Sequence, residues 1–280
     1  MIGLVSMMAK EIHEKLLDLK VYLQELGPVA VAFSGGVDST FLLKVAHDTL
    51  GDGVTAFTAS SVFVPERDVA EAREFCEKEG VHHIIRTFDT LGIDGIRFNP
   101  TNRCYLCKYA LFSQFKEMAG QLGLAAVVDG TNLDDDGDYR PGRKALGELD
   151  IKSPLHQAGF TKQDIRDLSR ELGLATWSKP SFACLASRFV YGEELTPENL
   201  QRINEAEELL QAKGFTQFRV RQHGSLARIE LLPADIDRFM TVDIRADVAA
   251  KFRALGFDYV TLDLIGYRTG SMNEALNKEE

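Results

Sequence analysis

The chain has 280 residues, of which 45% are hydrophobic and 26% charged, a composition that is ordinary for a globular protein with one or two domains. Its formal net charge of −10 means that a global basic surface for nucleic acid is missing, which argues against an RNA-binding enzyme without excluding one. No apolar run reaches the ~20 residues that span a bilayer, and the four cysteines suit a reducing compartment better than a set of disulfides. We therefore expect a cytoplasmic protein with no membrane segment.

Apolar residues at helical spacing predict an amphipathic helix over 9–26, whose early charges argue against a signal peptide. Beyond it, short apolar runs alternate with helical patterns. Strands are expected over 29–33, 54–59, 82–88 and 125–128, and helices over 38–50, 66–80, 103–122 and 161–172. This alternation predicts an α/β fold with a doubly wound parallel sheet, in which ligands bind at the carboxyl ends of strands.

A glycine-rich turn, Ser34-Gly35-Gly36-Val37-Asp38-Ser39-Thr40, joins the first strand to its helix. Two glycines let the backbone turn sharply and approach a ligand. The start of the following helix offers N–H groups and the positive end of its dipole, and Ser34, Ser39 and Thr40 add hydroxyl groups, so the turn predicts an anion site. The spacing matches neither the Walker loop nor the dinucleotide motif. It resembles the SGGxDS loop of the PP-loop ATP pyrophosphatases, which cleave ATP to AMP and pyrophosphate; the alternative is a turn that binds nothing.

Polar residues follow other predicted strands as well. Ser60 and Ser61 end the second strand, and Gly130-Thr131-Asn132 follows the fourth, so these residues can line one crevice with the loop. The acidic, turn-rich segment 134–143 is expected to be a solvated loop; a loop that meets Mg-ATP is the alternative. Asp38 is a candidate Mg²⁺ ligand from its place in the loop.

The pattern changes near residue 178. Thr196 and the proline after it begin a strong helix that ends at Gly214. The remaining elements are expected to be strands over 217–221, 226–231 and 259–264, and helical segments over 233–240 and 243–255. We interpret the chain as a first domain over 1–189 and a small α+β domain over 190–280.

Cys76 lies within a predicted helix and is expected to be a core residue. The other three cysteines are candidates for a chemical role. Cys104 and Cys107 form a C-x-x-C near a helix start, and Cys184 lies in a linker. A closed zinc site usually takes four Cys or His ligands, whereas three thiolates can hold a [4Fe–4S] cluster with one iron free. The alternatives are three unconnected thiols, or Cys184 as a nucleophile whose pKa nearby cations lower.

Two pairs of charged residues share strand faces. Arg219 and Arg221 lie two apart on one strand, as do Arg228 and Glu230 on the next, and a hairpin would set the pairs side by side. Arginine forks match phosphate and carboxylate oxygens. The alternative is that these charged residues only form the solvent-facing side of a sheet. Glu207 and Glu230 are either contributors to a site or ordinary surface carboxylates.

Taken together, these segments resemble the LarE family, the sulfurtransferases that build the nickel-pincer cofactor of lactate racemase. The resemblance covers nearly the whole chain and rests on SGGVDST at 34–40, RCYLCK at 103–108, GTN at 130–132, DYRPGR at 138–143, ACLASRF at 183–189, RVR at 219–221 and RIEL at 228–231. The first motif is common to all PP-loop enzymes. The linker cysteine with LASR, together with the RVR and RIEL strands, is much more specific.

The resemblance implies a reaction. ATP with Mg²⁺ adenylates a carboxylate of pyridinium-3,5-biscarboxylic acid mononucleotide, and a sulfur nucleophile then displaces AMP to leave a thiocarboxylate. The residues implied for ATP are Ser34, Gly35, Gly36, Asp38, Ser39, Thr40, Ser60, Gly130, Thr131 and Asn132. The residues implied for the nucleotide substrate are Ser187, Arg188, Arg219, Arg221, Glu230 and Arg268.

Two variants of the family differ in their sulfur source. In one, the linker cysteine gives up its own sulfur and becomes dehydroalanine. In the other, a C-x-x-C and the linker cysteine hold a [4Fe–4S] cluster that delivers added sulfide. Because Cys104, Cys107 and Cys184 are all present, we favour the cluster variant. The family also implies a homo-oligomer, commonly a hexamer, and enzymes of the cofactor pathway as partners.

Three rival functions share the PP-loop. A tRNA thiolase should bring a basic RNA-binding surface or an added RNA domain, and neither is evident. An amide-forming synthetase uses ammonia and needs no cysteine constellation. A nucleotide sensor would bind ATP and release no pyrophosphate.

Overall fold

The computed structural model describes residues 2–136, 141–180, 183–268 and 270–272. The chain forms two compact units, one from Met1–Phe88 with Asn102–Phe182 and one from Asp89–Thr101 with Ala183–Glu280. The segment Asp89–Thr101 thus joins the second unit, although it precedes the boundary at residue 189 expected from the sequence. The first three residues of the DYRPGR segment, at 138–140, lie outside the described residues.

The first unit contains a parallel sheet of four strands in the order β3-β2-β1-β4, which confirms the predicted fold class. The strands are β1 (Val29–Ala32), β2 (Val54–Ser60), β3 (His82–Thr87) and β4 (Ala126–Val128). Val29 stands in register with Val54 on one side and with Ala126 on the other. The strand order reverses direction between β1 and β4, which is the point where open α/β sheets bind their ligands.

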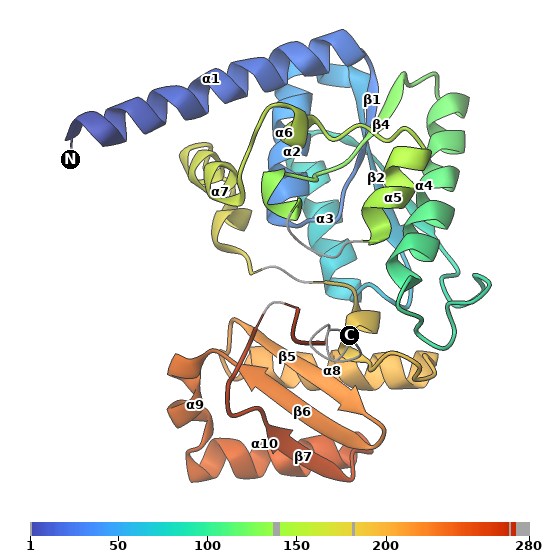
Figure 1. Cartoon of the computed structure of the whole chain (residues 1–280), viewed down its shortest axis with the longest axis vertical. Coiled ribbons are helices and arrows are strands. Elements are labelled where there is room, and N and C mark those ends of the chain that lie inside the picture. The colour runs from blue at the N-terminus through green and yellow to red at the C-terminus, as the bar shows by residue number, and fades with distance from the viewer. Residues whose placement is uncertain (1, 137–140, 181–182, 269, 273–280) are drawn as a thin grey trace, which may run out of the picture. The chain divides into compact units, whose positions relative to one another are not determined.

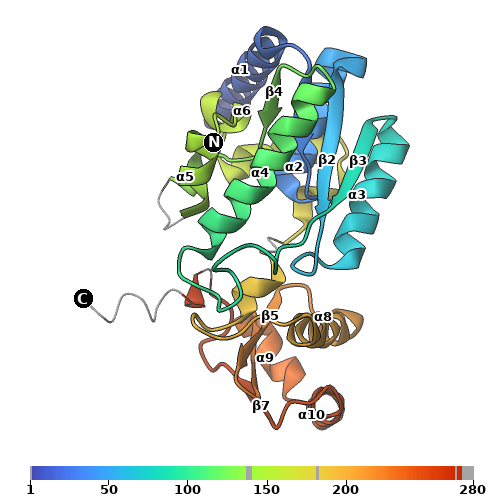
Figure 2. The ribbon, with the colours of Figure 1, turned by 90° about the vertical axis from the view of Figure 1, so that its right-hand side faces the viewer.

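Alternation along the strands sends side chains to two separate cores, as the period of two requires. Val29 and Val31 of β1 belong to one core, whereas Ala30 belongs to the other. Helices α2 (Val37–Leu50), α3 (Glu66–Glu79) and α7 (Lys162–Glu171) contribute to the first core, and α4 (Arg103–Gln121) and α5 (Pro141–Glu148) to the second. The two groups of helices flank the strands in Figures 1 and 2.

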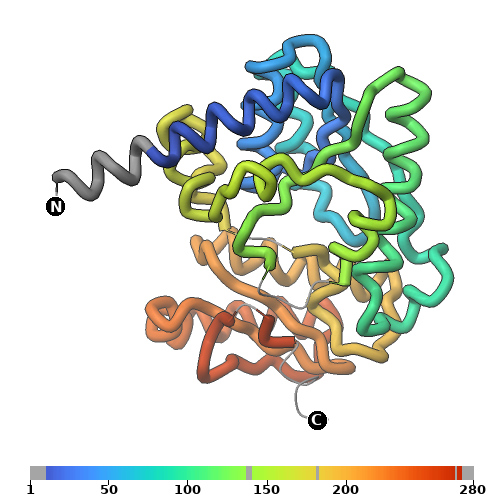
Figure 3. Tube along the Cα trace, turned by 45° about the horizontal axis from the view of Figure 1, so that its top comes forward, coloured from blue at the N-terminus to red at the C-terminus, as the bar shows by residue number. Residues whose placement is uncertain are grey.

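Two further helices complete this unit. The N-terminal α1 (Ile2–Leu26) packs against α2 and against the short α6 (Pro154–Gln157), as the trace in Figure 3 shows. Leu19 and Leu23, one turn apart on α1, are fully buried in the first core. In the described ranges, no helix combines the length and apolarity that a membrane crossing would require.

Helix α5 corrects one expectation. The segment 134–143 was expected to be a solvated loop, but residues 141–143 begin α5. Pro141 at the first helical position has a φ suited to a helix start and no N–H to leave unpaired. Ala145 and Leu146 are buried, and Leu146 packs in the core that holds Phe112 and Phe115 of α4. Packing against α4 therefore stabilises a helix whose own sequence gives only a short apolar signal.

The second unit has a three-stranded sheet in the order β5-β6-β7. β5 (Phe218–His223) and β6 (Leu226–Leu231) form an antiparallel hairpin, and β7 (Tyr259–Leu262) pairs with β6 in parallel. Its helices are α8 (Pro197–Ala212), α9 (Pro233–Phe239) and α10 (Val242–Ala254). This mixed sheet with its helices confirms the predicted small α+β part.

The N-terminus of α7 provides a test of the local structure. Thr161 accepts a hydrogen bond from the Asp164 N–H at 3.2 Å, and the Asp164 carboxylate accepts one from the Thr161 N–H at 3.0 Å. Thr161→Ala should lower the free energy of unfolding by about 1 kcal/mol, measured by denaturant unfolding with hydrogen exchange of the α7 amides. Thr241→Ala is the control, because the Thr241 hydroxyl donates to the Arg238 carbonyl at 2.9 Å and makes no cap bond to the described α10. Unchanged hydrogen exchange of the α7 amides in the Thr161 variant would contradict the proposed cap.

Candidate active site

The loop after β1 is held in shape by its own serines. The Ser39 hydroxyl accepts a hydrogen bond from the Ser34 N–H at 3.3 Å and lies 3.1 Å from the Ser34 hydroxyl. It also donates to the Gly36 carbonyl at 3.3 Å. Gly35 adopts a φ of 67°, in the left-handed region that favours glycine. The N-cap residue of α2 is Gly36, which has no side chain to cap the helix, so the first turn depends on other groups to satisfy its amides.

The turn after β4 lies directly against this loop. A Cβ added at Gly130 would stand 3.1 Å from the Ser39 amide nitrogen and 3.2 Å from the Asp38 Cβ. Only glycine permits this approach without displacement of the α2 backbone. The structure thus brings together the two strand ends that the sequence predicted to share a crevice.

Hydrogen bonds fix the other residues of the same turn. The buried Asp129 carboxylate accepts from the hydroxyl groups of Thr131 and Ser153, both at 2.6 Å. Asn132 is 3% exposed, and its side chain accepts from the Asp134 N–H at 3.0 Å. The sequence placed Asp129 in this turn without proposing it as a site residue, and Ser153, 24 residues away, was not singled out.

The remaining predicted ATP residues differ in accessibility. Ser60 ends β2 and is half-buried. Thr40 is 1% exposed, and its hydroxyl has no hydrogen-bond partner within the described chain. Asp38 is engaged, because its Oδ2 lies 2.5 Å from the Nζ of Lys162. Lys162 was not singled out from the sequence; a lysine in the first turn of a helix, where the dipole disfavours it, is the signal that could have identified it.

The four cysteines differ in burial: Cys76 is buried, as expected from the sequence, and the other three reach solvent at least in part. Cys76 is buried in the first core, and burial raises the pKa of its thiol to about 12. Cys104 is exposed and Cys107 half-buried in the first two turns of α4, where residues three apart share a helix face. Cys184 belongs to the second unit and is half-buried. Across the described residues, no His, Cys, Asp or Glu side chains gather in a group of three that could hold a metal ion.

A buried ion pair anchors the backbone that carries Cys184. The Nε and Nη2 atoms of Arg188 donate to the two carboxylate oxygens of Glu207 at 2.9 and 3.0 Å. The Nη1 atom of Arg188 donates to the carbonyls of Ala183 and Cys184 at 2.7 and 3.2 Å. Glu207 is completely buried, so its interpretation as a surface carboxylate is wrong.

The hairpin of β5 and β6 places the predicted arginines side by side. Arg219 faces Glu230 across the strands, and Arg221 faces Arg228. Arg221 donates to Glu230 at 2.9 Å and to the Ser187 carbonyl at 3.0 Å. Arg219 and Arg221 are 4% and 5% exposed and Glu230 is fully buried, so the interpretation of this face as solvated is wrong.

Residues near the C-terminus extend this charged face. The Ser271 hydroxyl donates to Glu230 at 2.7 Å, and the Arg219 guanidinium stacks over the Tyr267 ring at 5.1 Å from its centroid. Arg268 pairs with Asp263 at 3.3 Å. Of these, Ser271, Tyr267 and Asp263 had no distinctive sequence signal.

Burial and neighbouring charges shift the pKa values of this group. Burial and the charge of Arg188 lower the pKa of Arg219 to about 10, against the opposing pull of Glu207. Burial opposes ionisation of Glu207, but the charge and hydrogen bonds of Arg188 prevail and hold its pKa below the usual value. The buried guanidinium groups of Arg188, Arg219 and Arg221 thus lie among the two buried carboxylates of Glu207 and Glu230. An anionic ligand would relieve the repulsion between the guanidinium groups.

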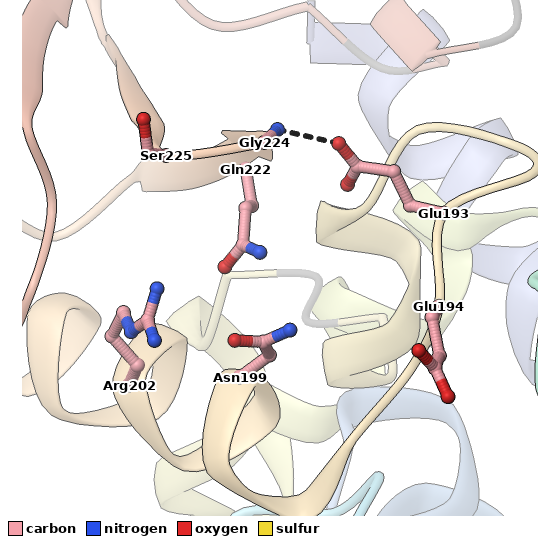
Figure 4. A pocket seen from close by; sticks show the side chains of 7 residues that line it. All are labelled: Glu193, Glu194, Asn199, Arg202, Gln222, Gly224 and Ser225. Carbon is pink, nitrogen blue, oxygen red and sulfur yellow. Dashed lines mark hydrogen bonds between the residues drawn. The ribbon is translucent and has the colours of Figure 1, made fainter.

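A separate cavity of about 300 Å³ lies in the second unit. It is lined by Glu193, Glu194, Asn199, Arg202, Gln222, Gly224 and Ser225. Figure 4 shows the Gln222 amide near Arg202 and Asn199 of α8, and Glu193 accepting a bond from the Gly224 N–H. None of the seven lining residues belongs to the predicted site.

Pyridinium-3,5-bisthiocarboxylic acid mononucleotide synthase of Lactiplantibacillus plantarum is 42% identical to this chain over 259 residues, which are 92% of this chain and 93% of the synthase. This chain belongs to the LarE family. An uncharacterised protein of Synechocystis is 41% identical over 95% of this chain and over its own full length. No protein-family model matches the chain.

A more distant relative places this LarE-family enzyme among the PP-loop proteins. A tRNA-specific 2-thiouridylase of Heliobacterium modesticaldum is 27% identical in an alignment 190 positions long, which covers 54% of this chain and 49% of the thiouridylase. The match to the thiouridylase leaves about half of each protein unaligned, in contrast to the nearly complete match to the synthase.

The contact between the two turns generates a prediction. Gly130→Ala should push the start of α2 away by a few tenths of an ångström and weaken ATP binding, measured by calorimetric titration. Gly120→Ala is the matched control, because a Cβ at Gly120 would meet nothing within 4 Å in the described structure. ATP binding by the Gly130 variant at the affinity of the unsubstituted protein would show that the loop does not need this contact.

The buried ion pair between Arg188 and Glu207 makes stability depend on pH. Because folding lowers the pKa of Glu207, this carboxylate stabilises the folded state above its unfolded pKa, and that contribution is lost as pH falls through the folded value. Glu207→Gln should cost roughly 3–5 kcal/mol at neutral pH, because Arg188 is left buried and unpaired. It should also reduce the loss of stability on acidification. Denaturant unfolding at several pH values measures both, with the exposed Glu208→Gln as control; equal effects of the two variants would contradict the assignment.

Proposed function

We propose that this protein transfers sulfur to pyridinium-3,5-biscarboxylic acid mononucleotide in an ATP-dependent reaction, as a step toward the nickel-pincer cofactor of lactate racemase. The observation that carries the proposal is the match to the synthase at 42% identity over 92% of the chain. The preorganised loop and the buried arginine face agree with the two kinds of anion that such a reaction must bind.

The first proposed step is adenylation. A carboxylate oxygen of the substrate attacks the α-phosphorus of ATP, a P–O bond breaks, and pyrophosphate leaves. The amides at the start of α2 and the hydroxyl groups of Ser34 and Ser39 would stabilise the negative charge of the phosphates. Asp38 is the proposed ligand of the Mg²⁺ that accompanies ATP, and the contacts of Gly130 keep the loop in place.

In the second step, a sulfur nucleophile attacks the acyl carbon of the adenylate, AMP leaves, and a thiocarboxylate remains. Adenylation is needed because a carboxylate oxygen is a poor leaving group. Arg219, Arg221 and Arg268, with Ser187 and Arg188, would hold a substrate that carries two carboxylates and a phosphate. Glu230 orients Arg221 through the 2.9 Å bond between them.

We propose that the sulfur comes from a [4Fe–4S] cluster held by Cys104, Cys107 and Cys184. Cys104 and Cys107 suit two ligand positions, because they are one helical turn apart and both reach solvent in part. When bound by three thiolates, such a cluster leaves one iron to carry added sulfide. The alternative is that Cys184 gives up its own sulfur once and becomes dehydroalanine.

Other properties of the protein are proposed from the family alone. We infer a cytoplasmic homo-oligomer, commonly a hexamer in this family, that exchanges its substrate and product with other enzymes of the cofactor pathway. A tRNA thiolase is the second candidate function. The net charge of −10 and the partial coverage of the thiouridylase argue against it.

Cysteine variants test the sulfur source. With ATP and the biscarboxylate nucleotide, Cys184→Ser should still release pyrophosphate, because adenylation needs no thiol, but should form no thiocarboxylate. Cys104→Ser should behave in the same way only if a cluster supplies the sulfur. Thiocarboxylate formed by the Cys184 variant would overturn the proposed role of this residue, whereas its loss would argue against an amide-forming synthetase, which needs no cysteine.

The anaerobically purified protein gives an independent readout. We expect iron and sulfide, and an unchanged protein mass after thiocarboxylate has formed. Absence of iron after anaerobic reconstitution, with a loss of about one H₂S (~34 Da) at Cys184 after turnover, would replace the cluster by single-use donation from the cysteine thiolate.

A further inference from the structure

Two lysines of the first unit approach the PP-loop from one stretch of chain. The geometry points to Lys162 and Lys179 as residues that bind the phosphate groups of ATP. This inference rests on the proposed function, in that ATP is taken as the substrate of the loop. It adds two cationic groups to a set that otherwise consists of amides and hydroxyls.

Lys179 is fixed at the backbone of the loop. Its Nζ donates to the Gly35 carbonyl at 3.1 Å and to the Glu71 carboxylate at 2.6 Å, and it lies 3.9 Å from Asp68. The side chain is 19% exposed, so the ammonium group is held close to the protein surface instead of extending into solvent. A lysine that served only as a surface ion pair would not need to reach the carbonyl of the second residue of the loop.

Lys162, from the same stretch of chain as Lys179, contacts the loop at Asp38. Its Nζ lies 2.5 Å from Asp38 Oδ2, and its side chain is 27% exposed. Lys162 is the first residue of α7, where the positive end of the helix dipole disfavours a cation. Thr161 and Asp164 already cap this helix, so the stability of α7 does not explain the lysine.

The charge of the ligand accounts for both lysines. The triphosphate of ATP brings several negative charges to a loop whose own groups are dipoles. An ammonium group is a compact charge with three donors that can follow a phosphate as it leaves. In the described chain, Asp38 and Glu71 hold the two ammonium groups near the loop. Because Asp38 is also the proposed Mg²⁺ ligand, Mg²⁺ entering with ATP would compete for Asp38 and free Lys162 to contact phosphate.

The test compares single variants of the full chain. Lys162→Gln and Lys179→Gln should each weaken binding of ATP and of pyrophosphate about tenfold, the size expected for one charge-assisted hydrogen bond. Binding of AMP, which lacks the β- and γ-phosphates, should stay within about twofold. Equilibrium binding is measured by calorimetric titration with each ligand, and circular dichroism verifies that each variant is folded.

Lys44→Gln is the matched control. Lys44 lies on α2, the helix that follows the loop; its side chain is 22% exposed, and it pairs with Asp48 at 2.8 Å and with Glu79 at 3.0 Å. Its removal deletes two ion pairs without touching the loop, so its affinity for all three ligands should equal that of the unsubstituted protein. Lys162→Arg and Lys179→Arg should recover part of the lost ATP affinity, because they restore the charge.

The outcomes separate this inference from the proposed function. Affinities for ATP and pyrophosphate equal to those of the Lys44 control would overturn the assignment of the lysines. An equal loss of affinity for AMP and ATP would also overturn it, because the lysines would then only shape the loop. If the unsubstituted protein fails to bind ATP, the proposed function itself is wrong.

Discussion

Strand β1 is the constraint on which the first unit depends. Val29, Ala30 and Val31 are fully buried, because β1 is paired on both edges and covered on both faces. Such a strand has no position for a polar side chain, and its apolar run must end where the sheet ends. The polar loop begins at that point. The packing of β1 in the sheet therefore fixes the position at which the loop begins, at Ser34.

The second unit relies on charge where the first relies on apolar packing. Arg188 and Glu207 satisfy one another and the backbone around Cys184, and Arg221 does the same with Glu230 and the Ser187 carbonyl. Burial of ions is costly, and a well-packed apolar pair is often at least as stable. In the function proposed for this protein, the arrangement serves as the framework of an anion site, and stability alone does not account for it.

Local features of this chain were predictable from sequence, and long-range ones were not. The strand alternation, the glycine turn and the cap at Thr161 follow from residues a few positions apart. The contact of Lys162 with Asp38 joins residues 124 apart, and that of Lys179 with Gly35 joins residues 144 apart. Such contacts depend on how the helices and loops pack on the sheet, which residues a few positions apart do not reveal. Burial of Arg219 likewise ran against the ordinary tendency of strand arginines to face water, because its counter-charges lie on other elements.

Cys76 has a practical consequence for counting thiols. Burial raises the pKa of this thiol to about 12, so at neutral pH almost none of it is the reactive thiolate. The other three cysteines reach solvent at least in part. A thiol reagent added to the native apoprotein should therefore label up to three sites rapidly and the fourth only after denaturation. Labelling of Cys76 therefore reports unfolding of the protein. In the same experiment, labelling of the other three cysteines reports whether a metal or a modification occupies them.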